Sequence, residues 1–246
     1  MSKLMGDWWQ ALLNLIFPHC RCIACGEEVK LDNTGLCGNC RRIIQDETMI
    51  YHSCASCPTF IPLEARYCLN CLREPPWFFD AGIAVFPYQD VIRQVLQDFK
   101  YRGTVKWAKP LGTLMAEAVL HKLPFHNITT VIPVPLHPNR ERTRGYNQSE
   151  LLAREIGRRL DVRVDVSILL RIRDTPSQTG LSKEGRRGNL HEAFQIRESG
   201  DLTGKTVLLV DDIYTTGITV NTCSRILKEA GTKAVFVATC AAGKRY

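Results

Sequence analysis

The stretch Val207-Leu208-Leu209-Val210-Asp211-Asp212-Ile213-Tyr214-Thr215-Thr216-Gly217-Ile218-Thr219 decides how this chain folds. Its four leading residues form a short apolar run, which is typical of a strand buried on both faces of a parallel sheet. Beyond the stretch, apolar residues recur at helical spacing from Val220 to Ala230, and Gly231 follows as a helix C-cap would. We therefore expect a strand over 206–210, a loop over 211–219 and a helix after it.

The expected loop begins with two adjacent carboxylates, Asp211 and Asp212. In open α/β sheets ligands bind at the carboxyl ends of the strands, where the free N–H groups of a helix start can bind phosphate. The residues that follow supply hydroxyl donors and a flexible backbone: Thr215, Thr216, Gly217 and Thr219. The loop lacks the lysine of a Walker motif and the glycine spacing of a dinucleotide site. Its acids and hydroxyls instead suit a phosphorylated sugar.

These residues resemble the phosphoribosyl-pyrophosphate (PRPP) loop of type I phosphoribosyltransferases, in which two acids hold the ribose hydroxyls and a Thr-Thr-Gly-x-Thr turn holds the 5′-phosphate. The resemblance implies catalytic roles for Asp211 and Asp212. It implies a PRPP-binding set completed by Thr215, Thr216, Gly217 and Thr219. It also implies Mg²⁺ between the donor hydroxyls and the pyrophosphate. The alternative is an ordinary strand-to-helix turn that happens to be acidic.

Nine of the eleven cysteines precede residue 72, and eight of them form C-x-x-C pairs: Cys22/Cys25, Cys37/Cys40, Cys54/Cys57 and Cys68/Cys71. Two such pairs complete a tetrahedral zinc shell, so we predict two structural Zn²⁺ sites. Sequential pairing is the simpler arrangement, and a cross-braced one stays open. A disulfide framework or a set of redox-active pairs would also account for cysteines in this number. Three further side chains are weaker ligand candidates: His19, Cys20 and His52.

The composition is that of an ordinary globular protein, with 45% hydrophobic and 23% charged residues. A net charge of +7 over 246 residues favours anionic ligands without identifying nucleic acid. No apolar stretch approaches the ~18 residues of a membrane span, and no cleavage site follows the apolar residues 11–17. We therefore expect a cytoplasmic protein without a membrane span, whose residues 8–17 form a short amphipathic helix.

Two segments of the expected domain are rich in arginine. Residues 136–148, after an expected strand over 129–134, carry Arg140, Arg142 and Arg144, and the long polar segment 171–189 carries Arg186 and Arg187. The resemblance to type I phosphoribosyltransferases implies a pyrophosphate loop in the first segment, where guanidinium groups would suit a diphosphate. The second segment is predicted as a lid, because loops of this length are usually functional. The alternative is a solvated basic surface. Either Lys100 or Arg102, after an expected helix over 91–99, is a further candidate for a ligand phosphate, and a helix-capping role is its alternative.

The remaining pattern alternates strands and helices. We expect strands over 81–86, 162–170 and 234–240, and helices over 111–120 and 148–160. Cys223 and Cys240 lie in apolar patterns that indicate buried packing. The Pro-Pro punctuation after residue 74 suggests two domains, with a double zinc ribbon over 1–75 and a phosphoribosyltransferase-like domain over 76–246.

Nearly the whole chain resembles the ComF (competence protein F) family. The motifs that carry this resemblance are the cysteine pairs and the segments Phe99-Lys100-Tyr101-Arg102-Gly103, Val131-Ile132-Pro133-Val134-Pro135-Leu136, Arg144-Gly145-Tyr146-Asn147-Gln148, Gln178-Thr179-Gly180-Leu181 and Arg186-Arg187-Gly188-Asn189. The resemblance implies an α/β fold, a type I phosphoribosyltransferase-like parallel sheet flanked by helices and preceded by a small cysteine-rich double zinc-ribbon domain. It also implies natural transformation, with single-stranded DNA and other cytoplasmic DNA-uptake proteins as partners.

Three functions stay open at this point. The first is a PRPP-binding protein that serves DNA uptake, and the second is a nucleobase-salvage phosphoribosyltransferase. The third is a module that only binds nucleic acid, supported by 12 Lys and Arg against 7 Asp and Glu over 137–187. In that case Tyr101, Trp107 and Tyr146 are the candidate stacking residues.

Overall fold

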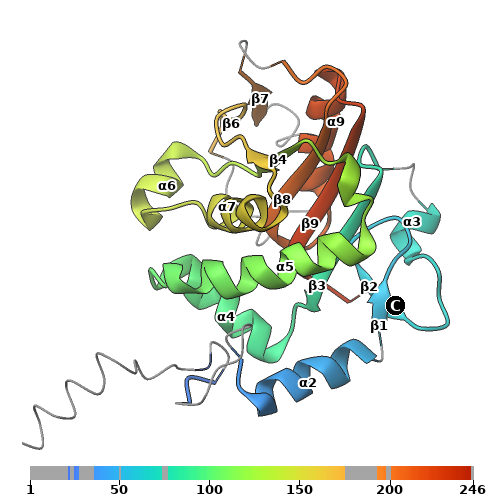
Figure 1. Cartoon of the computed structure of the whole chain (residues 1–246), viewed down its shortest axis with the longest axis vertical. Coiled ribbons are helices and arrows are strands. Elements are labelled where there is room, and N and C mark those ends of the chain that lie inside the picture. The colour runs from blue at the N-terminus through green and yellow to red at the C-terminus, as the bar shows by residue number, and fades with distance from the viewer. Residues whose placement is uncertain are drawn as a thin grey trace, which may run out of the picture.

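A computed structural model of the chain describes residue 22 and residues 25–27, 36–49, 51–73, 77–174, 193–197 and 201–244. Its centre is a five-stranded parallel sheet in the order β3-β9-β8-β4-β5 (Figure 1). The strands are β3 (Ala81–Pro87), β4 (Thr130–Pro133), β5 (Arg163–Val164), β8 (Thr206–Tyr214) and β9 (Ala234–Ala242). The prediction of a parallel sheet is confirmed, with the predicted strand at residue 206 in its middle.

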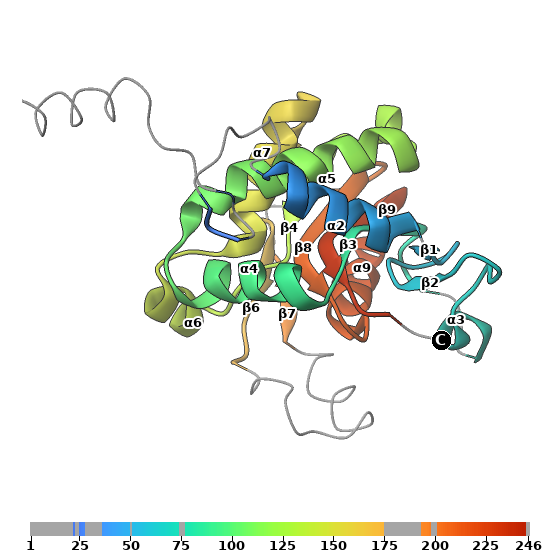
Figure 2. The same cartoon turned by 90° about the horizontal axis from the view of Figure 1, so that it is seen from below.

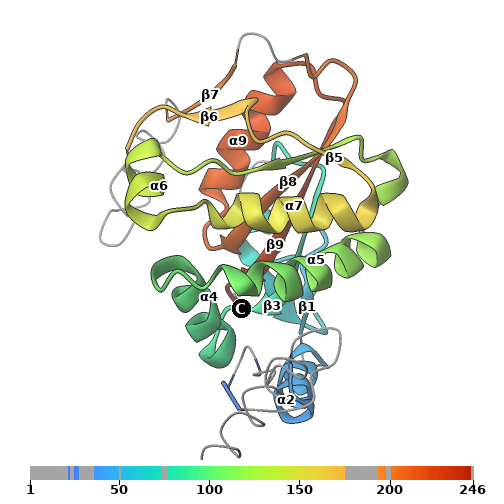
Figure 3. The same cartoon turned by 60° about the vertical axis from the view of Figure 1, so that its left-hand side comes forward.

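Helices cover both faces of this sheet (Figure 3). One face packs against α4 (Asp90–Tyr101), α5 (Ala108–Lys122) and α7 (Gln148–Leu160). The other packs against α9 (Ile218–Glu229) and an antiparallel hairpin of β6 (Leu169–Arg171) and β7 (Phe194–Ile196). Shorter elements connect them: α6 (Pro138–Arg144) and the 3-10 helices Val105–Trp107 and Phe125–Asn127.

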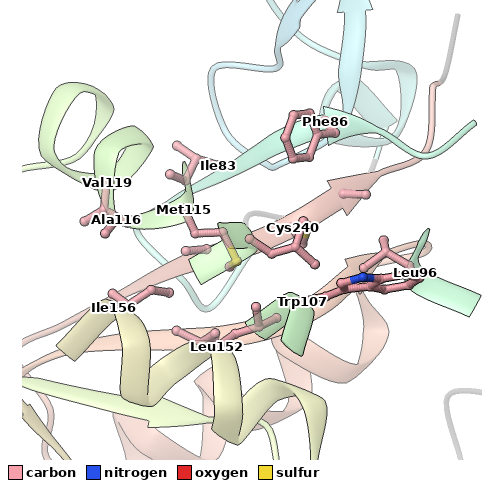
Figure 4. Packing of buried hydrophobic residues seen from close by; sticks show 14 of the residues in the cluster. Ile83, Phe86, Leu96, Trp107, Met115, Ala116, Val119, Leu152, Ile156 and Cys240 are labelled. Atoms are coloured by element: carbon pink, nitrogen blue, oxygen red, sulfur yellow. The ribbon is translucent and has the colours of Figure 1, made fainter. Parts of the chain in front are cut away.

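Side chains of β8 alternate between the two layers of the core. Leu208 and Val210 pack toward α5 and α7, whereas Val207 and Leu209 pack toward α9. The first layer is shown in Figure 4, where Met115 and Val119 of α5 and Leu152 and Ile156 of α7 meet residues of the sheet such as Cys240. Burial on both faces explains why this strand is apolar at every position from Val207 up to its acid pair.

The cysteine-rich region consists of α2 (Gly38–Met49), β1 (Tyr51–Ser53), β2 (Phe60–Pro62) and α3 (Leu69–Arg73). Figures 1 and 2 show β1, β2 and α3 at one end of the molecule and α6 at the opposite end. Phe60 pairs with Lys244, so β2 is joined to the segment that follows β9. The division into domains at residue 75 stays a prediction.

Three local predictions need correction. The segment 136–148 contains the helix α6, because His137 caps its start, Pro138 occupies its first position and Gly145 ends it with φ of 87°. The strand expected over 162–170 is interrupted, because the Asp165 side chain accepts hydrogen bonds from the backbone N–H groups of Ser167 and Ile168.

The third correction concerns the ligand loop. β8 continues through Asp211 and Asp212 to Tyr214, because β9 also runs on to Ala242 and pairs with it over this length. The loop is therefore limited to residues 215–217, and the acid pair belongs to the strand. Within the described residues, no helix is both long and apolar enough to cross a membrane.

Candidate functional site

The carboxyl edge of the sheet opens into a cavity of about 550 Å³. Side chains from the ends of β8, β4, β6 and α4, from α6 and from the start of α7 meet there. Its polar lining residues are Tyr88, Lys100, Tyr101, Arg140, Arg144, Asn147, Gln148, Ser149, Arg171, Asp211, Asp212, Thr215, Thr216 and Thr219. The region around the acid pair and the region after β4 thus line one cavity.

The two adjacent acids have different partners. Asp212 is buried, and its Oδ2 lies 2.9 Å from Nζ of Lys100 at the end of α4. Asp211 Oδ1 accepts hydrogen bonds of 2.9 Å from the Ser149 hydroxyl in the first turn of α7 and from the backbone N–H of Asp212. Both acids are therefore held by helices of the same layer.

Burial and the neighbouring charge of Asp212 raise the pKa of Asp211 to about 7, against the opposing effect of Lys100. For Lys100, burial acts to lower the pKa, but the charge and hydrogen bond of Asp212 outweigh it and the pKa is raised. Lys100 and Asp212 thus form a charged pair, while Asp211 can gain or lose a proton near neutral pH. A carboxylate in that state is suited to accept a proton or to bind a cation.

The turn after β8 presents three threonines to the cavity, Thr215, Thr216 and Thr219. Gly217 is the N-cap of α9 with φ of 80°, a backbone conformation that glycine adopts without strain. A Cβ on Gly217 would lie 2.3 Å from the hydroxyl oxygen of Tyr214. The need for glycine therefore comes from the packing beneath the turn as well as from its backbone angle.

The arginines predicted for the pyrophosphate loop are divided by α6. Arg140 and Arg144 line the cavity, whereas Arg142 is not in its described lining and donates a hydrogen bond to Asn139 instead. Arg140 pairs with Asp174 at 2.9 Å, and the Arg144 guanidinium lies 5.3 Å from the centre of the Tyr101 ring. Arg186 and Arg187 lie outside the described residues.

Seven polar residues of the cavity lining were absent from the predicted site: Tyr88, Lys100, Tyr101, Asn147, Gln148, Ser149 and Arg171. Only some of them had a signal in the sequence. Lys100 belonged to the Lys100–Arg102 alternative, which the structure resolves in favour of Lys100, since Arg102 pairs with Asp98 away from the described lining. Arg171 was assigned to the lid segment but ends β6, where burial and the charge of Arg140 lower its pKa. Ser149 gave no signal beyond its place at a helix start.

The cysteines form two clusters: Cys22, Cys25, Cys37 and Cys40, and Cys54, Cys57, Cys68 and Cys71. The prediction of sequential pairing is confirmed and the cross-braced alternative is wrong. All the described cysteines are free in this structure. His52 contacts backbone carbonyl groups instead of a cluster, and His19 and Cys20 lie outside the described residues. Cys223 and Cys240 are buried, as predicted.

Both clusters fit a tetrahedral ion. Sulfur atoms are 3.8 Å apart for Cys25–Cys37 and for Cys57–Cys68, which is the edge of a tetrahedron whose arms are about 2.3 Å, the usual zinc–sulfur distance. Backbone N–H groups also donate to sulfur, from Cys37 to Cys22 and from Cys68 to Cys54. Such donors stabilise thiolates, and each cluster can therefore hold a zinc ion in a closed shell of four ligands.

Comparison with known proteins finds a phosphoribosyl transferase domain and relatives named for competence and DNA utilization. Residues 147–246 match the model of a phosphoribosyl transferase domain. The chain is 33% identical over 226 residues to competence protein F of Haemophilus influenzae, covering 90% of this chain and 96% of that protein. It is 29% identical over 219 residues to the DNA utilization protein YhgH of Escherichia coli, covering 88% and 94%, and 28% identical over 232 residues to competence protein ComFC of Streptococcus pneumoniae, covering 87% and 96%.

Proposed function

The chain belongs to the competence protein F family, and we propose that it binds PRPP in the cavity at the carboxyl edge of the sheet. The observation that carries the proposal is the meeting of an acid pair, a threonine turn at a helix start and four cations in one cavity. These groups match the hydroxyls, the 5′-phosphate and the pyrophosphate of that ligand. The cavity volume of about 550 Å³ also lies in the range of small-molecule sites, roughly 300 to 1,000 Å³.

Each part of the cavity has a proposed partner. Asp211 and Asp212 hold the ribose hydroxyls, together with Mg²⁺, which suits carboxylate and phosphate oxygens. The 5′-phosphate binds at the start of α9, where the proposed ligands are Thr215, Thr216, Gly217 and Thr219. The pyrophosphate binds the cations Lys100, Arg140, Arg144 and Arg171, and we assign Arg186 and Arg187 to the same role. Arg142 stays outside this set.

The same geometry suits phosphoribosyl transfer, in which an acceptor displaces pyrophosphate from C1 of the ribose. Positioning and charge stabilisation suffice for that step, so the chain needs no covalent nucleophile. Asp211 is suited to accept the proton of the acceptor, since its pKa of about 7 is near the working pH. Release of pyrophosphate from PRPP with nucleobases tests a salvage reaction, which is the alternative to binding without turnover.

The names of the relatives support a proposal for the biological role. Proteins named for competence and for DNA utilization match nearly the full length of this chain. We propose that this protein works in the cytoplasm during DNA uptake, beside other proteins of that process, and that zinc is the ion in both cysteine clusters. About two zinc ions per chain are expected by elemental analysis. Disulfides in freshly purified reduced protein would contradict the zinc assignment.

Calorimetry with PRPP and Mg²⁺ tests the binding site. The double substitution Asp211→Asn and Asp212→Asn should abolish binding, because the ribose and the cation lose their ligands. Thr216→Val should weaken it by about 1 to 3 kcal/mol through one lost hydrogen bond to a charged group. Asp201→Asn is the control, because this exposed acid lies before the amino end of β8. Equal PRPP affinity for the parent and the double variant would show that the site is misplaced.

Single-stranded DNA is a second candidate ligand, and Tyr101 is the observation that favours it. Its side chain is 74% exposed at the mouth of the cavity, with the Arg144 guanidinium against its ring. An exposed aromatic ring beside a cation is the usual stacking platform for a base. Trp107 is buried in the core, so it is not available for stacking, and the Tyr146 hydroxyl donates to the backbone of Phe99.

Fluorescence anisotropy of a labelled oligonucleotide at several salt concentrations tests this ligand. The logarithm of affinity should fall by about 0.7 per neutralised phosphate for each tenfold rise in salt. Glutamine in place of Arg140, Arg142, Arg186 and Arg187 should flatten that slope, and Tyr101→Ala should weaken binding at every salt concentration. Undetectable binding even at low salt would leave the small-molecule function alone.

A further inference from the structure

We propose that the second cysteine cluster (Cys54, Cys57, Cys68 and Cys71) positions the turn 215–217 through Tyr214 and Trp77, so that metal bound to this cluster strengthens PRPP binding. The inference rests on the proposed PRPP site. It assigns positioning roles to Tyr214 and Trp77, which do not belong to the described lining of the cavity. It also gives the two cysteine clusters different roles, although each consists of four cysteines.

The first step is the contact between Tyr214 and the turn. Tyr214 is the last residue of β8, and its ring lies under Gly217, where a Cβ would be 2.3 Å from the phenol oxygen and 2.7 Å from the ring carbon that carries it. Tyr214 is also buried, with 2% of its surface exposed. A movement of this ring therefore changes the position of the N-cap residue of α9, where the phosphate is proposed to bind.

The second step joins Tyr214 to the cluster. Its hydroxyl is buried and has no hydrogen-bond partner among the described residues. Cys57 is buried in the same core layer as Tyr214. A thiolate that holds a metal ion is a good acceptor, whereas a neutral thiol is a weak one. The unsatisfied hydroxyl therefore fits a cluster whose cysteines are metal ligands.

Trp77 makes an independent connection to the same cluster. Its Nε1–H donates to Cys71 Sγ at 3.1 Å, and its ring meets the Tyr214 ring edge-on, with 6.4 Å between the centroids. The other neighbour of this ring is Phe79, stacked at 5.4 Å. Trp77 therefore contacts a cluster ligand and the side chain that supports the turn.

A third connection reaches the first turn of α9 directly. The backbone N–H of Phe78 donates to Asn221 Oδ1 at 2.8 Å, and the backbone N–H of Asn221 donates to the carbonyl of Gly217 at 2.9 Å. The segment 77–79, which begins at the Trp77 contact with the cluster, is thus hydrogen-bonded to the helix that follows the turn. Loss of order around Cys71 would disturb both supports of the turn together.

The first cluster has a different environment. Its buried members Cys22, Cys37 and Cys40 belong to the core layer of α4, α5 and α7, on the other face of the sheet from α9. Small cysteine-rich modules depend on metal for their folding, so loss of metal should loosen each cluster locally. Only the second cluster packs in the layer of Tyr214 and Trp77, and coupling to the turn is expected for this cluster alone.

The test compares Cys71→Ser with Cys25→Ser, the least buried ligand of each cluster, in the full chain. Hydrogen–deuterium exchange of the backbone over 213–222 is measured without PRPP, and calorimetry then measures PRPP with Mg²⁺. Cys71→Ser should speed exchange in this segment and weaken PRPP binding at least about tenfold, within the usual range of coupling between sites. Cys25→Ser should change neither. Equal effects of the two variants, or no effect of Cys71→Ser on exchange, would overturn the inference.

Tyr214→Phe is the second variant, for the case in which Cys71→Ser does not fold. It retains the ring and removes only the hydroxyl, and Tyr51→Phe is its control in the same core layer, away from the turn. Zinc retention against a colorimetric chelator should fall in Tyr214→Phe and not in Tyr51→Phe. Linkage requires that PRPP in turn strengthen zinc retention in the parent protein by the factor that zinc gives PRPP.

The two proposals fail separately. A zinc-loaded parent that does not bind PRPP would refute the PRPP site, while the exchange measurement would still decide the positioning role. Zinc retention that is unchanged by PRPP and by Tyr214→Phe would refute the coupling and leave the PRPP site standing.

Discussion

The segments that follow β8 and β4 leave the same edge of the sheet and line one cavity, yet they are built differently. At the end of β8, the charges are buried and paired within the fold, as in Asp212 with Lys100, and the turn that follows is closely packed at Gly217. After β4, the arginines lie on a short helix, and a Cβ at Gly145 would meet nothing within 4 Å. The first segment is part of the core, and the second is attached to its surface.

This difference predicts where substitutions affect folding and where they affect only the ligand. Buried ion pairs and crowded turns carry large penalties when one partner is removed, because nothing replaces the lost group. Removing one partner of an exposed ion pair costs little stability, because water replaces the lost partner. Substitutions at the end of β8 and in the turn that follows it should therefore lower the stability of the fold. Substitutions in the segment after β4 should instead lower the affinity for PRPP.

The largest effect is expected for Lys100→Met. The side chains of Lys100 and Asp212 are 23% and 10% exposed, so the substitution leaves a mostly buried carboxylate without its cation. The free energy of unfolding at pH 7 should fall by about 3 to 5 kcal/mol in urea titrations. Arg102→Met is the matched control at the end of the same helix, where a 74% exposed arginine pairs with Asp98, and less than about 1 kcal/mol should be lost. Similar losses for both would remove the distinction between buried and exposed charge here.

Gly217→Ala should come next. The new Cβ meets the Tyr214 hydroxyl at 2.3 Å and also imposes a φ of 80° on alanine, so unfolding should become easier by about 2 to 4 kcal/mol. Gly145→Ala has a similar φ of 87° but open space, and only the backbone cost of about 1 kcal/mol is expected. Thermal and urea unfolding of the two variants are compared. The difference between their losses of stability gives the cost of the packing clash apart from the cost of backbone strain. A loss at Gly145 as large as that at Gly217 would contradict the packing difference.

Asp211 should give the protein an unusual pH dependence. Its pKa is raised in the fold from 3.8 to about 7, so the folded state binds the proton more tightly than the unfolded state. This contribution to stability is complete below about pH 4 and is lost as the pH rises through about 7. At about 1.4 kcal/mol per pKa unit it amounts to roughly 4 kcal/mol in all, of which roughly 2 to 3 kcal/mol falls between pH 5 and pH 8. Urea unfolding at pH 5 and pH 8, without PRPP or Mg²⁺, should show the decline in the parent protein and a weaker one in Asp211→Asn. Parallel curves for the two proteins would contradict the raised pKa.

The smallest effect on stability is expected at the arginines after β4. Arg144→Gln should leave the free energy of unfolding within about 1 kcal/mol of the parent value, because water replaces the lost contacts. Its affinity for PRPP should nevertheless fall about tenfold, through the loss of a charge-assisted hydrogen bond. Arg142→Gln is the control, because this side chain lies outside the described lining. An equal loss of affinity in both variants would indicate a general effect of net charge instead of a pyrophosphate contact.

Much of this site was predictable because its residues are neighbours in the sequence. The stretch from Val207 to Thr219 contains the strand, the acid pair, the threonines and the helix start, so its order alone places the groups together. The cysteine pairs are similar, since a C-x-x-C turn directs two sulfur atoms to one point. The fold class, the sequential pairing of the clusters and the burial of Cys223 and Cys240 followed from such local patterns.

Contacts between distant segments were not predictable in this way. Lys100 and Ser149 reach the acid pair from two helices, and the choice of Lys100 over Arg102 depends on how α4 packs on the sheet. The helix α6 separates Arg142 from Arg140 and Arg144, although a loop over the same residues was equally consistent with their spacing. The extension of β8 to Tyr214 depended on its partner β9.

The sequence by itself determined the chemistry of this protein: two sets of four thiolates, an acid pair at a strand end, a hydroxyl-rich turn and an excess of basic residues between 137 and 187. Only the tertiary structure decided which of these groups meet, and it placed the two similar cysteine clusters in opposite layers of the core. The physical reason is that spacing along a chain fixes the angle between near neighbours, whereas the position of distant segments is set by how their apolar faces pack. Tyr214 illustrates both limits, because it follows the acid pair in sequence and yet only packing brings it between Gly217 and the second cluster.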